Sequence, residues 1–505
     1  MIDSSTPVLV GVGQLTQRWQ DPASQKHPMA LMADAARAAF EDCGATGIIA
    51  GVDSLHVVNT FTWPYDDLPG QLAAELGVPA THREYTGIGG NTPQRLVNHA
   101  CAELASGRRR AVLIVGAEAL DSTMHAASAG IDLPWPAPAG TTPSPATGNV
   151  DEERDGVGPM EKAHGLVLPI HVYPLLETAL RADARRSPAD HQAHVGRLFA
   201  RLSQVAATHA QAWFPTVRSA DEIATPTADN RYICYPYTKL MNAIMRVDQA
   251  AALLLTTVDE AERLGIDPDR WVFPMGGADL NDIWDLARRA SLIESPALQT
   301  AASTALAQAG VGIDEVDVFD LYSCFPSAVQ IARRALGIAE DDGRELTVTG
   351  GLPYFGGAGN NYGSHAIATV AQRVRSRPAT LAMVTGMGWY VTKHAVGVYG
   401  KRPPAQRWTD RDTTAAQAAI EAAAMPPPVE RADGRLTIEA FTIRHERDGT
   451  PSRGTAIGRL ADGRRALAVI DAGPAELELL EREELVGRTG TVHHDESSER
   501  NILKM

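Results

Sequence analysis

Cysteine is scarce in this chain, and no two cysteines lie close together in the sequence. The chain has 505 residues and four cysteines, none of them in a Cys-x-x-Cys spacing: Cys43, Cys101, Cys234 and Cys324. This pattern disfavours a disulfide scaffold and a zinc ribbon, and it favours the reduced cytoplasm as the compartment. Each cysteine is predicted to be a buried packing residue.

Long apolar runs and an excess of basic charge are also lacking. The longest apolar stretch, near Ala250 to Val258, is far shorter than the roughly 20 residues that span a bilayer. The start, MIDSSTPVLVGVG, has no basic residues followed by an apolar run, so no signal peptide is expected. Lys plus Arg number 46 against 61 Asp plus Glu, a net charge of −15. Neither a membrane nor a nucleic acid is therefore an expected partner.

The first 120 residues alternate strand-like apolar runs with amphipathic helical patterns. Val8 to Val12 and Ala111 to Val115 read as buried strands, whereas Met29 to Phe40 and Thr92 to Ala105 have helical spacing. With 44% hydrophobic residues there is ample material for a core. This alternation predicts a layered α/β fold.

Residues 119–235 interrupt that alternation and are predicted to be an insertion. Helical patterns lie at about 170–186 and 190–213. A preceding stretch is predicted to be loop because five prolines crowd into it: Pro134, Pro136, Pro138, Pro143 and Pro145.

The pattern then returns as a repeat of the first half. Residues 358–385 match 89–116: each has Gly-Asn, a helix of similar length, an Arg-containing turn and a buried strand. Residues 297–322 likewise echo Met29 to Val58. Such repeated units indicate one duplicated α/β domain, in which neither copy buries its sheet alone.

The C-terminal part has a different period. Prolines near 401–404 and 426–428 flank an alanine-rich helical segment, and from about 430 apolar residues alternate with polar ones. Asp448-Gly449 and Asp462-Gly463 are typical of hairpin turns. A small β-barrel that folds as a separate unit is predicted.

Several ordered motifs in residues 5–400 resemble the thiolase superfamily, in particular the sterol-carrier-type thiolases. Gly116-Ala117-Glu118 resembles the Gly-Ala-Glu turn of that family, and Tyr235 to Thr256 resembles the strand that returns after its loop domain. Asp320 to Phe325 resembles the His-Asp-Cys-Phe motif. Gly350-Gly351 through His365 stands where those enzymes carry Gly-His-Pro.

The resemblance implies a duplicated thiolase fold of layered αβαβα type, with an inserted loop domain and a C-terminal small β-barrel of the OB-like kind. The implied division is an N-terminal half, an inserted CoA-binding domain, the end of the first half, a C-terminal half, a linker and the barrel: 1–118, 119–235, 236–290, 291–400, 401–429 and 430–505.

The departures from the family concern its catalytic thiols. The position of the nucleophilic cysteine falls on Gly90, and the second, Cys-x-Gly cysteine falls in Val384-Thr385-Gly386. Tyr322 replaces the residue that positions the oxyanion water. Because glycine cannot form an acyl-enzyme, ordinary thiolase turnover is disfavoured. A cysteine restored at position 90 is predicted to stand at a helix start, where its pKa would be lowered.

Three side chains remain as candidate catalytic groups: His365, Tyr322 and Tyr362. By resemblance His365 would polarise the thioester oxygen, and its alternative is a satisfied core histidine. Tyr322 would act as acid or base, or simply pack. Tyr362 would at least line the glycine-rich loop.

Asn91, Asn360 and Gly386 are assigned to the turns around this site. The two asparagines begin paired helices, and the simplest role for each is a helix N-cap. Backbone N–H groups in these turns are the alternative, as an oxyanion hole.

The expected function is binding of CoA thioesters in fatty-acyl or sterol metabolism, with acyltransferase-like or carbon–carbon bond-cleaving chemistry that needs no cysteine. Some thiolase-like proteins that lack the nucleophile are aldolases that work beside a small barrel protein. The alternative is a non-catalytic acyl-CoA or lipid carrier, or a scaffold. No cofactor is expected besides CoA as substrate or ligand, and the chain is expected to be a homodimer or a monomer.

Overall fold

The computed structural model describes residues 2–138, 154–408 and 413–505. Pro143 and Pro145, predicted to lie in a loop, fall outside the described residues. Among the helices of the described ranges, none combines the length and apolar character that a bilayer crossing needs.

Two sheets with the same strand order form the core. In the first sheet the order is β1-β7-β4-β2-β3, and in the second it is β8-β11-β10-β9. In the order given, the second strand of each sheet is antiparallel to both of its neighbours, and the third strand is parallel to the fourth. The strands are β1 (Pro7–Gln17), β2 (Val52–Val57), β3 (His82–Tyr85), β4 (Ala111–Ala119), β7 (Asp248–Thr257), β8 (Phe273–Asn281), β9 (Val318–Asp320), β10 (Ala382–Gly388) and β11 (Lys393–Gly400).

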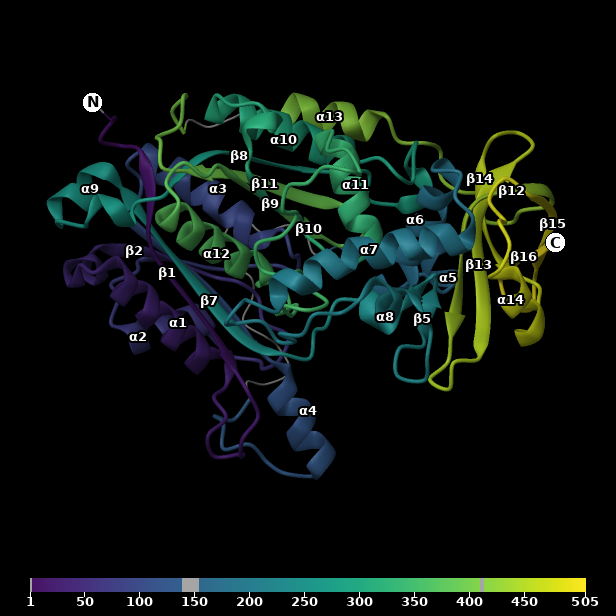
Figure 1. The fold of residues 1–505 in the computed structure, drawn as a ribbon, viewed down its shortest axis with the longest axis horizontal. Coiled ribbons are helices and arrows are strands. Elements are labelled where there is room, and N and C mark those ends of the chain that lie inside the picture. The colour runs from purple at the N-terminus through teal and green to yellow at the C-terminus, as the bar shows by residue number, and fades with distance from the viewer. Residues whose placement is uncertain (1, 139–153, 409–412) are drawn as a thin grey trace.

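Helices complete five layers around these sheets (Figure 1). Helices α3 and α12 lie between the sheets and touch both, α1 and α2 cover the outer face of the first sheet, and α10 covers that of the second. The duplicated, layered αβαβα prediction is confirmed. The helices of the core are α1 (Pro28–Cys43), α2 (Leu68–Leu76), α3 (Thr92–Ala105), α9 (Val258–Arg263), α10 (Pro296–Ala309), α11 (Pro326–Leu336) and α12 (Tyr362–Ser376).

Helix α3 packs closely on the second sheet because strands β8 and β11 carry glycines where they face it. A Cβ at Gly277 of β8 would overlap the amide of Asn98 on α3, and a Cβ at Gly397 of β11 would overlap the amide of Gln94. Glycine therefore lets α3 approach the strands closely. This contact fixes where the helix N-terminus, and Gly90 before it, stands relative to β10.

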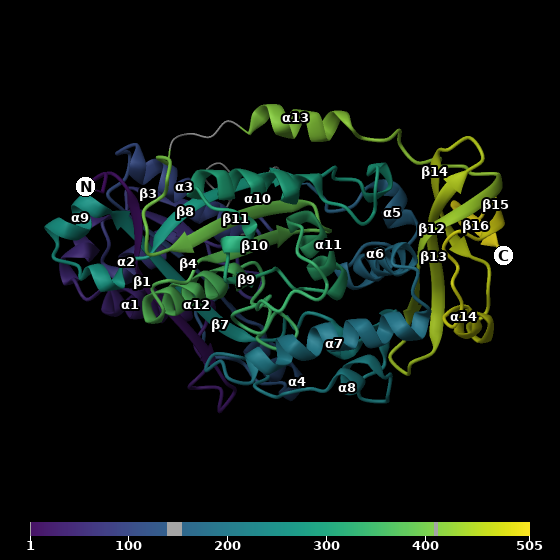
Figure 2. The ribbon, with the colours of Figure 1, turned by 45° about the horizontal axis from the view of Figure 1, so that its top comes forward.

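The insertion is mainly helical, and the two helical patterns predicted there are confirmed in α6 and α7. Figure 2 shows both helices between the core and the C-terminal strands. The inserted elements are α4 (Leu120–Ala129), α5 (Pro159–Ala163), α6 (Pro169–Asp183), α7 (Pro188–Ala206), α8 (Ala220–Ala224), β5 (Tyr232–Tyr235) and β6 (Tyr237–Thr238).

The C-terminal strands close into a five-stranded barrel, as predicted. Its order is β13-β14-β16-β15-β12, with β12 and β13 also paired. Helix α14 lies between the third and fourth strands in the chain, and helix α13 precedes the barrel and packs on α10. The elements are α13 (Thr414–Ala422), β12 (Gly434–His445), β13 (Pro451–Leu460), β14 (Arg465–Ile470), α14 (Pro474–Leu480), β15 (Thr489–Asp495) and β16 (Arg500–Lys504).

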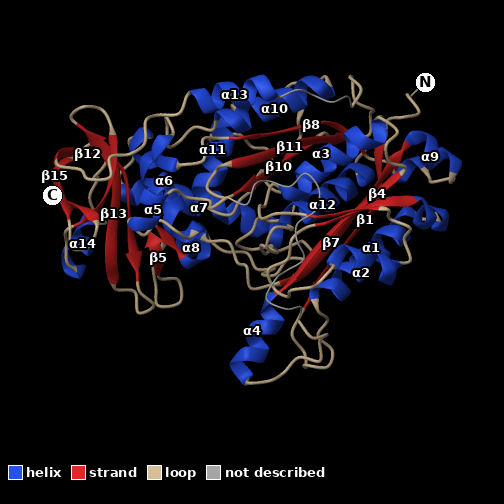
Figure 3. Ribbon diagram, turned by 180° about the vertical axis from the view of Figure 1, so that it is seen from behind, coloured by secondary structure: helices blue, strands red, loops and turns tan. Residues whose placement is uncertain are grey.

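The barrel is docked firmly on the insertion (Figure 3). Strand β5 pairs with β12, so the prediction of one strand spanning Tyr235 to Thr256 is wrong: the strand that returns to the core is β7, from Asp248. Arg181 of α6, which is buried, bridges Glu484 at 2.8 Å and the Tyr235 hydroxyl at 2.8 Å. These polar contacts tie the barrel to the core.

Candidate functional site

Gly90 and Tyr322 compete for one small volume where the two halves meet. Gly90 precedes α3, and Tyr322 follows β9. A Cβ built on Gly90 would overlap the Tyr322 hydroxyl and lie 2.6 Å from the carbonyl oxygen of Met387 on β10. The phenol of Tyr322 therefore stands where any side chain at position 90 would have to stand.

Tyr322 is held rigidly in this position. Its backbone N–H donates to Oγ1 of Thr385 at 2.9 Å, and its ring lies edge-on to that of Tyr362 with centroids 5.5 Å apart. Burial raises the pKa of Tyr322, with the neighbouring Cys324 as a second cause. The group is therefore a neutral phenol at physiological pH, able to donate a hydrogen bond or a proton.

Tyr362 is brought next to Tyr322 but its hydroxyl is engaged elsewhere. It donates to Oδ1 of Asp320 at 2.9 Å and lies 2.6 Å from Oγ1 of Thr349. Burial raises the pKa of both Tyr362 and Asp320. This network orients the Tyr362 ring, which in turn supports that of Tyr322.

His365 is fully buried and contacts the first half of the molecule. Its Nδ1 lies 3.0 Å from Oε1 of Gln14 on β1, its ring packs on Phe355, and its Nε2 has no hydrogen-bond partner. Burial, with a smaller contribution from His209, lowers the pKa of His365 to about 3. The imidazole is thus neutral at physiological pH, and it can act as a hydrogen-bonding group but not as a standing positive charge.

Acid should destabilise the fold through His365. Because the folded-state pKa of about 3 lies below the usual 6.5, unfolding takes up a proton once the pH falls below 6.5. The free energy of unfolding should decrease by about 2 kcal/mol between pH 7.5 and pH 5 through this group. Urea unfolding across this range should show a shallower pH slope in His365→Gln, whereas the exposed His125→Gln should keep the wild-type slope. An unchanged slope in His365→Gln would show that this imidazole already titrates normally in the folded protein.

Asn91 and Asn360 do not cap their helices, so that prediction is wrong. Asn91 occupies the N-cap position of α3 without a side-chain cap, and the N-cap position of α12 is held by Asn361. Oδ1 of Asn360 instead accepts from the Gly89 N–H at 2.8 Å, and its Nδ2 donates to the Asn59 carbonyl. The amide is drawn away from its own helix because it joins the two halves of the duplication.

Asn91 and Gly386 meet at the same turn. A Cβ at Gly386 would lie 2.9 Å from Cα of Asn91. The buried Oδ1 of Asn91 has no hydrogen-bond partner. Beside it opens a cavity of about 430 Å³, bounded further by the end of β8 and by α13. The turn around Gly90 therefore combines an unsatisfied acceptor with open space.

The cysteines are free and buried, as predicted: Cys43, Cys101, Cys234 and Cys324. Burial raises the pKa of Cys324, the thiol nearest to Tyr322 in the sequence, to about 12, and that of Cys234 also to about 12. A thiol with such a pKa is not a thiolate at neutral pH and is a poor nucleophile.

One part of the site carried no sequence signal: the hairpin between β10 and β11. Trp389 and Val391 have φ values of 57° and 54°, which are unfavourable for large and β-branched side chains. Tyr173 of α6 holds them there, since its hydroxyl donates to the Trp389 carbonyl at 2.6 Å and accepts from the Val391 N–H at 3.2 Å. Because neither residue is a glycine or an asparagine, this backbone conformation could not be predicted from the residue types. The strain lies two residues beyond Met387, which lines the Gly90 turn.

Comparisons with known proteins agree with this architecture. Residues 416–497 match the family model described as thiolase-like protein type 1 additional C-terminal domain. No curated protein sequence matches the chain significantly. The solved Ltp2–ChsH2(DUF35) aldolase is similar over 78% of this chain and 98% of its own, at 17% identity and a TM-score of 0.60. Human mitochondrial 3-ketoacyl-CoA thiolase in complex with CoA is similar over 79% and 98%, at 15% identity and a TM-score of 0.54.

A much closer similarity extends over the whole chain. A monomeric SCP2-thiolase-like protein type 1 from Mycobacterium smegmatis is 35% identical, with a TM-score of 0.84, and the match covers 100% of this chain and 99% of that one. It includes the duplicated core, the insertion and the barrel together. The chain therefore belongs to the SCP2-thiolase-like protein type 1 family.

Proposed function

We propose that the protein binds CoA thioesters of fatty-acyl or sterol-derived acids and acts on a carbon–carbon bond with Tyr322 in place of a cysteine nucleophile. The observation that carries this proposal is the position of the Tyr322 hydroxyl over Gly90. Where thiolase chemistry would place a thiol, this chain offers a neutral, buried phenol. A phenol in that place suits proton transfer better than acyl transfer.

The chemistry proposed for Tyr322 is protonation of a thioester enolate. In retro-aldol cleavage of a 3-hydroxyacyl-CoA, a water molecule takes the hydroxyl proton, the bond between Cα and Cβ breaks, and a ketone or aldehyde departs; the same proton, returned through water, restores the Tyr322 phenol after that group has protonated Cα. The electron pair stays on the thioester as an enolate, and Tyr322 would return a proton to Cα. The proposed donors to the enolate oxygen are the backbone N–H groups of Gly90 and Asn91, since that of Gly89 donates to Asn360.

The similarity to an aldolase made of two proteins supports a role for the barrel. That solved structure joins Ltp2 to a separate DUF35 protein, whereas the barrel here is part of the chain. We propose that the barrel takes the place of the separate partner. Because the whole-length relative is described as monomeric, we also propose a monomer rather than a homodimer.

Calorimetry and product analysis together test this function. The wild-type protein should bind acyl-CoA and release a shorter acyl-CoA from a 3-hydroxyacyl-CoA, detected by mass spectrometry. Tyr322→Phe should bind equally well and cleave about 100-fold more slowly, since it lacks the proton donor. Tyr354→Phe is the matched control, because the Tyr354 hydroxyl is buried without a hydrogen-bond partner.

The carrier alternative has its own support in the structure. The Tyr362 hydroxyl is engaged by Asp320, and the two cysteine thiols with a pKa of about 12 are neutral. A carrier would bind acyl-CoA but turn over neither 3-hydroxyacyl-CoA nor 3-ketoacyl-CoA. Failure to bind any CoA thioester at millimolar concentration would overturn both alternatives.

A further inference from the structure

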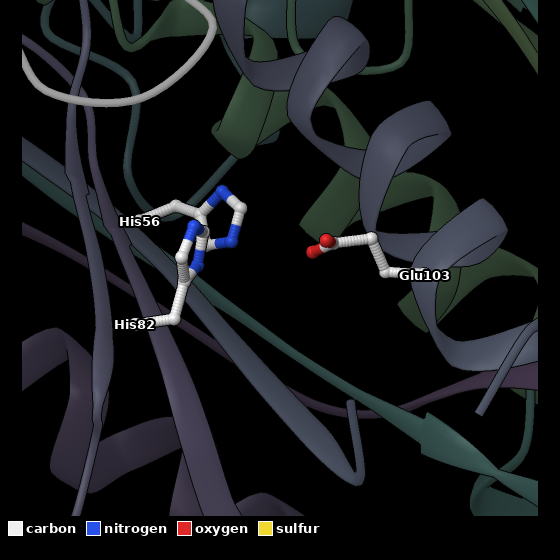
Figure 4. Close-up of side chains that lie close together, drawn as sticks. All are labelled: His56, His82 and Glu103. Atoms are coloured by element: carbon white, nitrogen blue, oxygen red, sulfur yellow. The ribbon is translucent and has the colours of Figure 1, made fainter. Parts of the chain in front are cut away.

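Two histidines and a glutamate converge at a place away from the residues to which the proposed function assigns a role. His56 lies on β2, His82 begins β3 and Glu103 stands on α3. One possible ligand atom from each lies within 4.8 Å of the other two. Figure 4 shows the two imidazoles side by side, with the carboxylate of Glu103 directed towards them. Two imidazoles and one carboxylate are a donor set that Zn²⁺ takes in proteins, with a water in the fourth position.

The ring of His56 is oriented as metal-bound histidines are. Oε2 of the buried Glu84 lies 3.2 Å from Nδ1 of His56, which favours a proton on that nitrogen and leaves the lone pair on Nε2. Nε2 of His56 and Nδ1 of His82 each lie 2.8 Å from the Ser54 hydroxyl. The two rings thus face the Ser54 hydroxyl, which a metal ion held by both nitrogens would have to displace.

The polar atoms of the three side chains are not fully satisfied. Oε2 of Glu103 has no hydrogen-bond partner, although the residue is only 7% exposed. A buried carboxylate oxygen without a partner costs free energy unless something charged completes it. Two arginines stand nearby: Nε of Arg109 is 3.4 Å from Glu103 Oε2, and Nε of Arg108 is 3.8 Å from Oε1. The ion pair between Arg109 Nε and Oε2 does not have hydrogen-bond geometry, so Zn²⁺ would compete with this guanidinium for Oε2.

We propose that His56, His82 and Glu103 are the ligands of a divalent first-row cation, and that Zn²⁺ is the cation that this donor set suits in tetrahedral geometry. Ligand atoms around tetrahedral Zn²⁺ lie about 3.4 Å apart. Rotation of the Glu103 side chain and of the half-buried His82 closes the remaining gap. The metal would clamp the C-terminal end of α3 to β2 and β3. The same helix carries Asn91 and the Gly90 turn at its other end, so the clamp would fix the position of that turn.

Metal titration of the full-length protein tests the site. After EDTA treatment and dialysis, calorimetry with Zn²⁺ alone should show one equivalent bound, and the melting temperature should rise with Zn²⁺ concentration. Co²⁺ should give the visible absorption of a four-coordinate site. His82→Ala should weaken Zn²⁺ binding at least 100-fold. His125→Ala, which changes a histidine on α4, should bind like the wild type.

Two further variants separate loss of a ligand from loss of the fold. Glu103→Gln keeps the size of the side chain and should also weaken binding at least 100-fold, with an unchanged circular dichroism spectrum. Arg109→Ala removes the competing cation and should tighten binding several-fold. Absence of Zn²⁺ binding to the wild type at 1 mM, or one equivalent that survives both His82→Ala and Glu103→Gln, would overturn the proposal. Unchanged or weaker binding to Arg109→Ala would remove Glu103 from the ligand set.

Discussion

Gly90→Ala is expected to destabilise the protein by more than about 3 kcal/mol, although it adds a single methyl group. The added carbon overlaps the Tyr322 hydroxyl and presses on the Met387 carbonyl. Neither group can retreat easily, because Tyr322 is packed on Tyr362 and Met387 belongs to the buried strand β10. Overpacking a rigid, buried site costs this much or more. Urea unfolding followed by circular dichroism measures it.

Gly473→Ala is the matched control. Gly473 has a φ of −78° and open space around its Cβ position, and it is the N-cap residue of α14, where alanine is less favourable than glycine. The free energy of unfolding should therefore decrease by no more than about 1 kcal/mol. In the Tyr322→Ala background, Gly90→Ala should cost less, because only the close contact with the Met387 carbonyl remains. The double-mutant cycle should therefore show a favourable coupling of about 2 kcal/mol. Additive costs would mean that Tyr322 does not occupy the space over Gly90.

The same overlap corrects the expectation for a restored thiol. Gly90→Cys alone has no room for a cysteine, so an acyl-enzyme should appear only in Gly90→Cys combined with Tyr322→Ala, where mass spectrometry can detect it. Wild-type thiolysis of acetoacetyl-CoA should stay near background, about 10⁶-fold below an enzyme with its nucleophile. Ordinary thiolysis rates in the wild type would show that another group serves as nucleophile.

Arg465→Ala is expected to lower the free energy of unfolding by about 3–5 kcal/mol. Arg465 lies on β14, is 2% exposed, and donates to Glu439 at 2.6 Å. It also donates to the carbonyl oxygens of Ala287 and Arg289 in the core, which joins the barrel to the rest of the chain. Removing it takes from Glu439 one of its two arginine partners, leaving Arg459, and it leaves the two buried carbonyl groups without this charged donor.

Arg464, the neighbour of Arg465 in the sequence, provides the control for this experiment. Arg464 pairs with the exposed Asp462, and its own side chain is 56% exposed. Arg464→Ala should therefore change the free energy of unfolding by less than about 1 kcal/mol. If Arg465→Ala behaved like Arg464→Ala, the barrel would be held by its other contacts, among them the β5–β12 pairing and the hydrogen bonds to Ala163 and His164.

Strands and helices with strong local patterns could be predicted from the sequence. The continuous apolar run at Ala111 to Val115 and the helical spacing of Thr92 to Ala105 decide their structure locally, and the repeat carries that prediction into the second half. Strand β5 could not be assigned in this way. Four residues that pair with a strand some 200 residues later leave no local pattern of their partner.

The candidate site, too, could be predicted from the sequence only in part. Motif order placed Tyr322, Tyr362 and Gly90 in one region, and the structure brings these three together. The steric exclusion between Gly90 and Tyr322 needs atomic distances, which no spacing supplies. The predicted capping role of Asn360 is wrong because its side chain reaches across to the other half of the duplicated fold. Asn91 stands at the N-cap position, but its side chain makes no capping hydrogen bond. His56 and His82 could not be predicted as ligands from the sequence, because they lie on neighbouring strands and form no compact metal-binding motif.

The pairing of β5 with β12 also has a consequence for folding during synthesis. The ribosome releases β5 some 200 residues before β12, a delay of roughly 10–40 s at usual rates of synthesis. Throughout that interval the edge of β5 is unpaired because β12 has not been made, and Arg181 lacks Glu484. An open strand edge pairs readily with other chains. The C-terminal barrel thus covers the edge of β5, and a chain truncated before β12 would keep an almost complete core with an exposed strand edge that can pair with other chains.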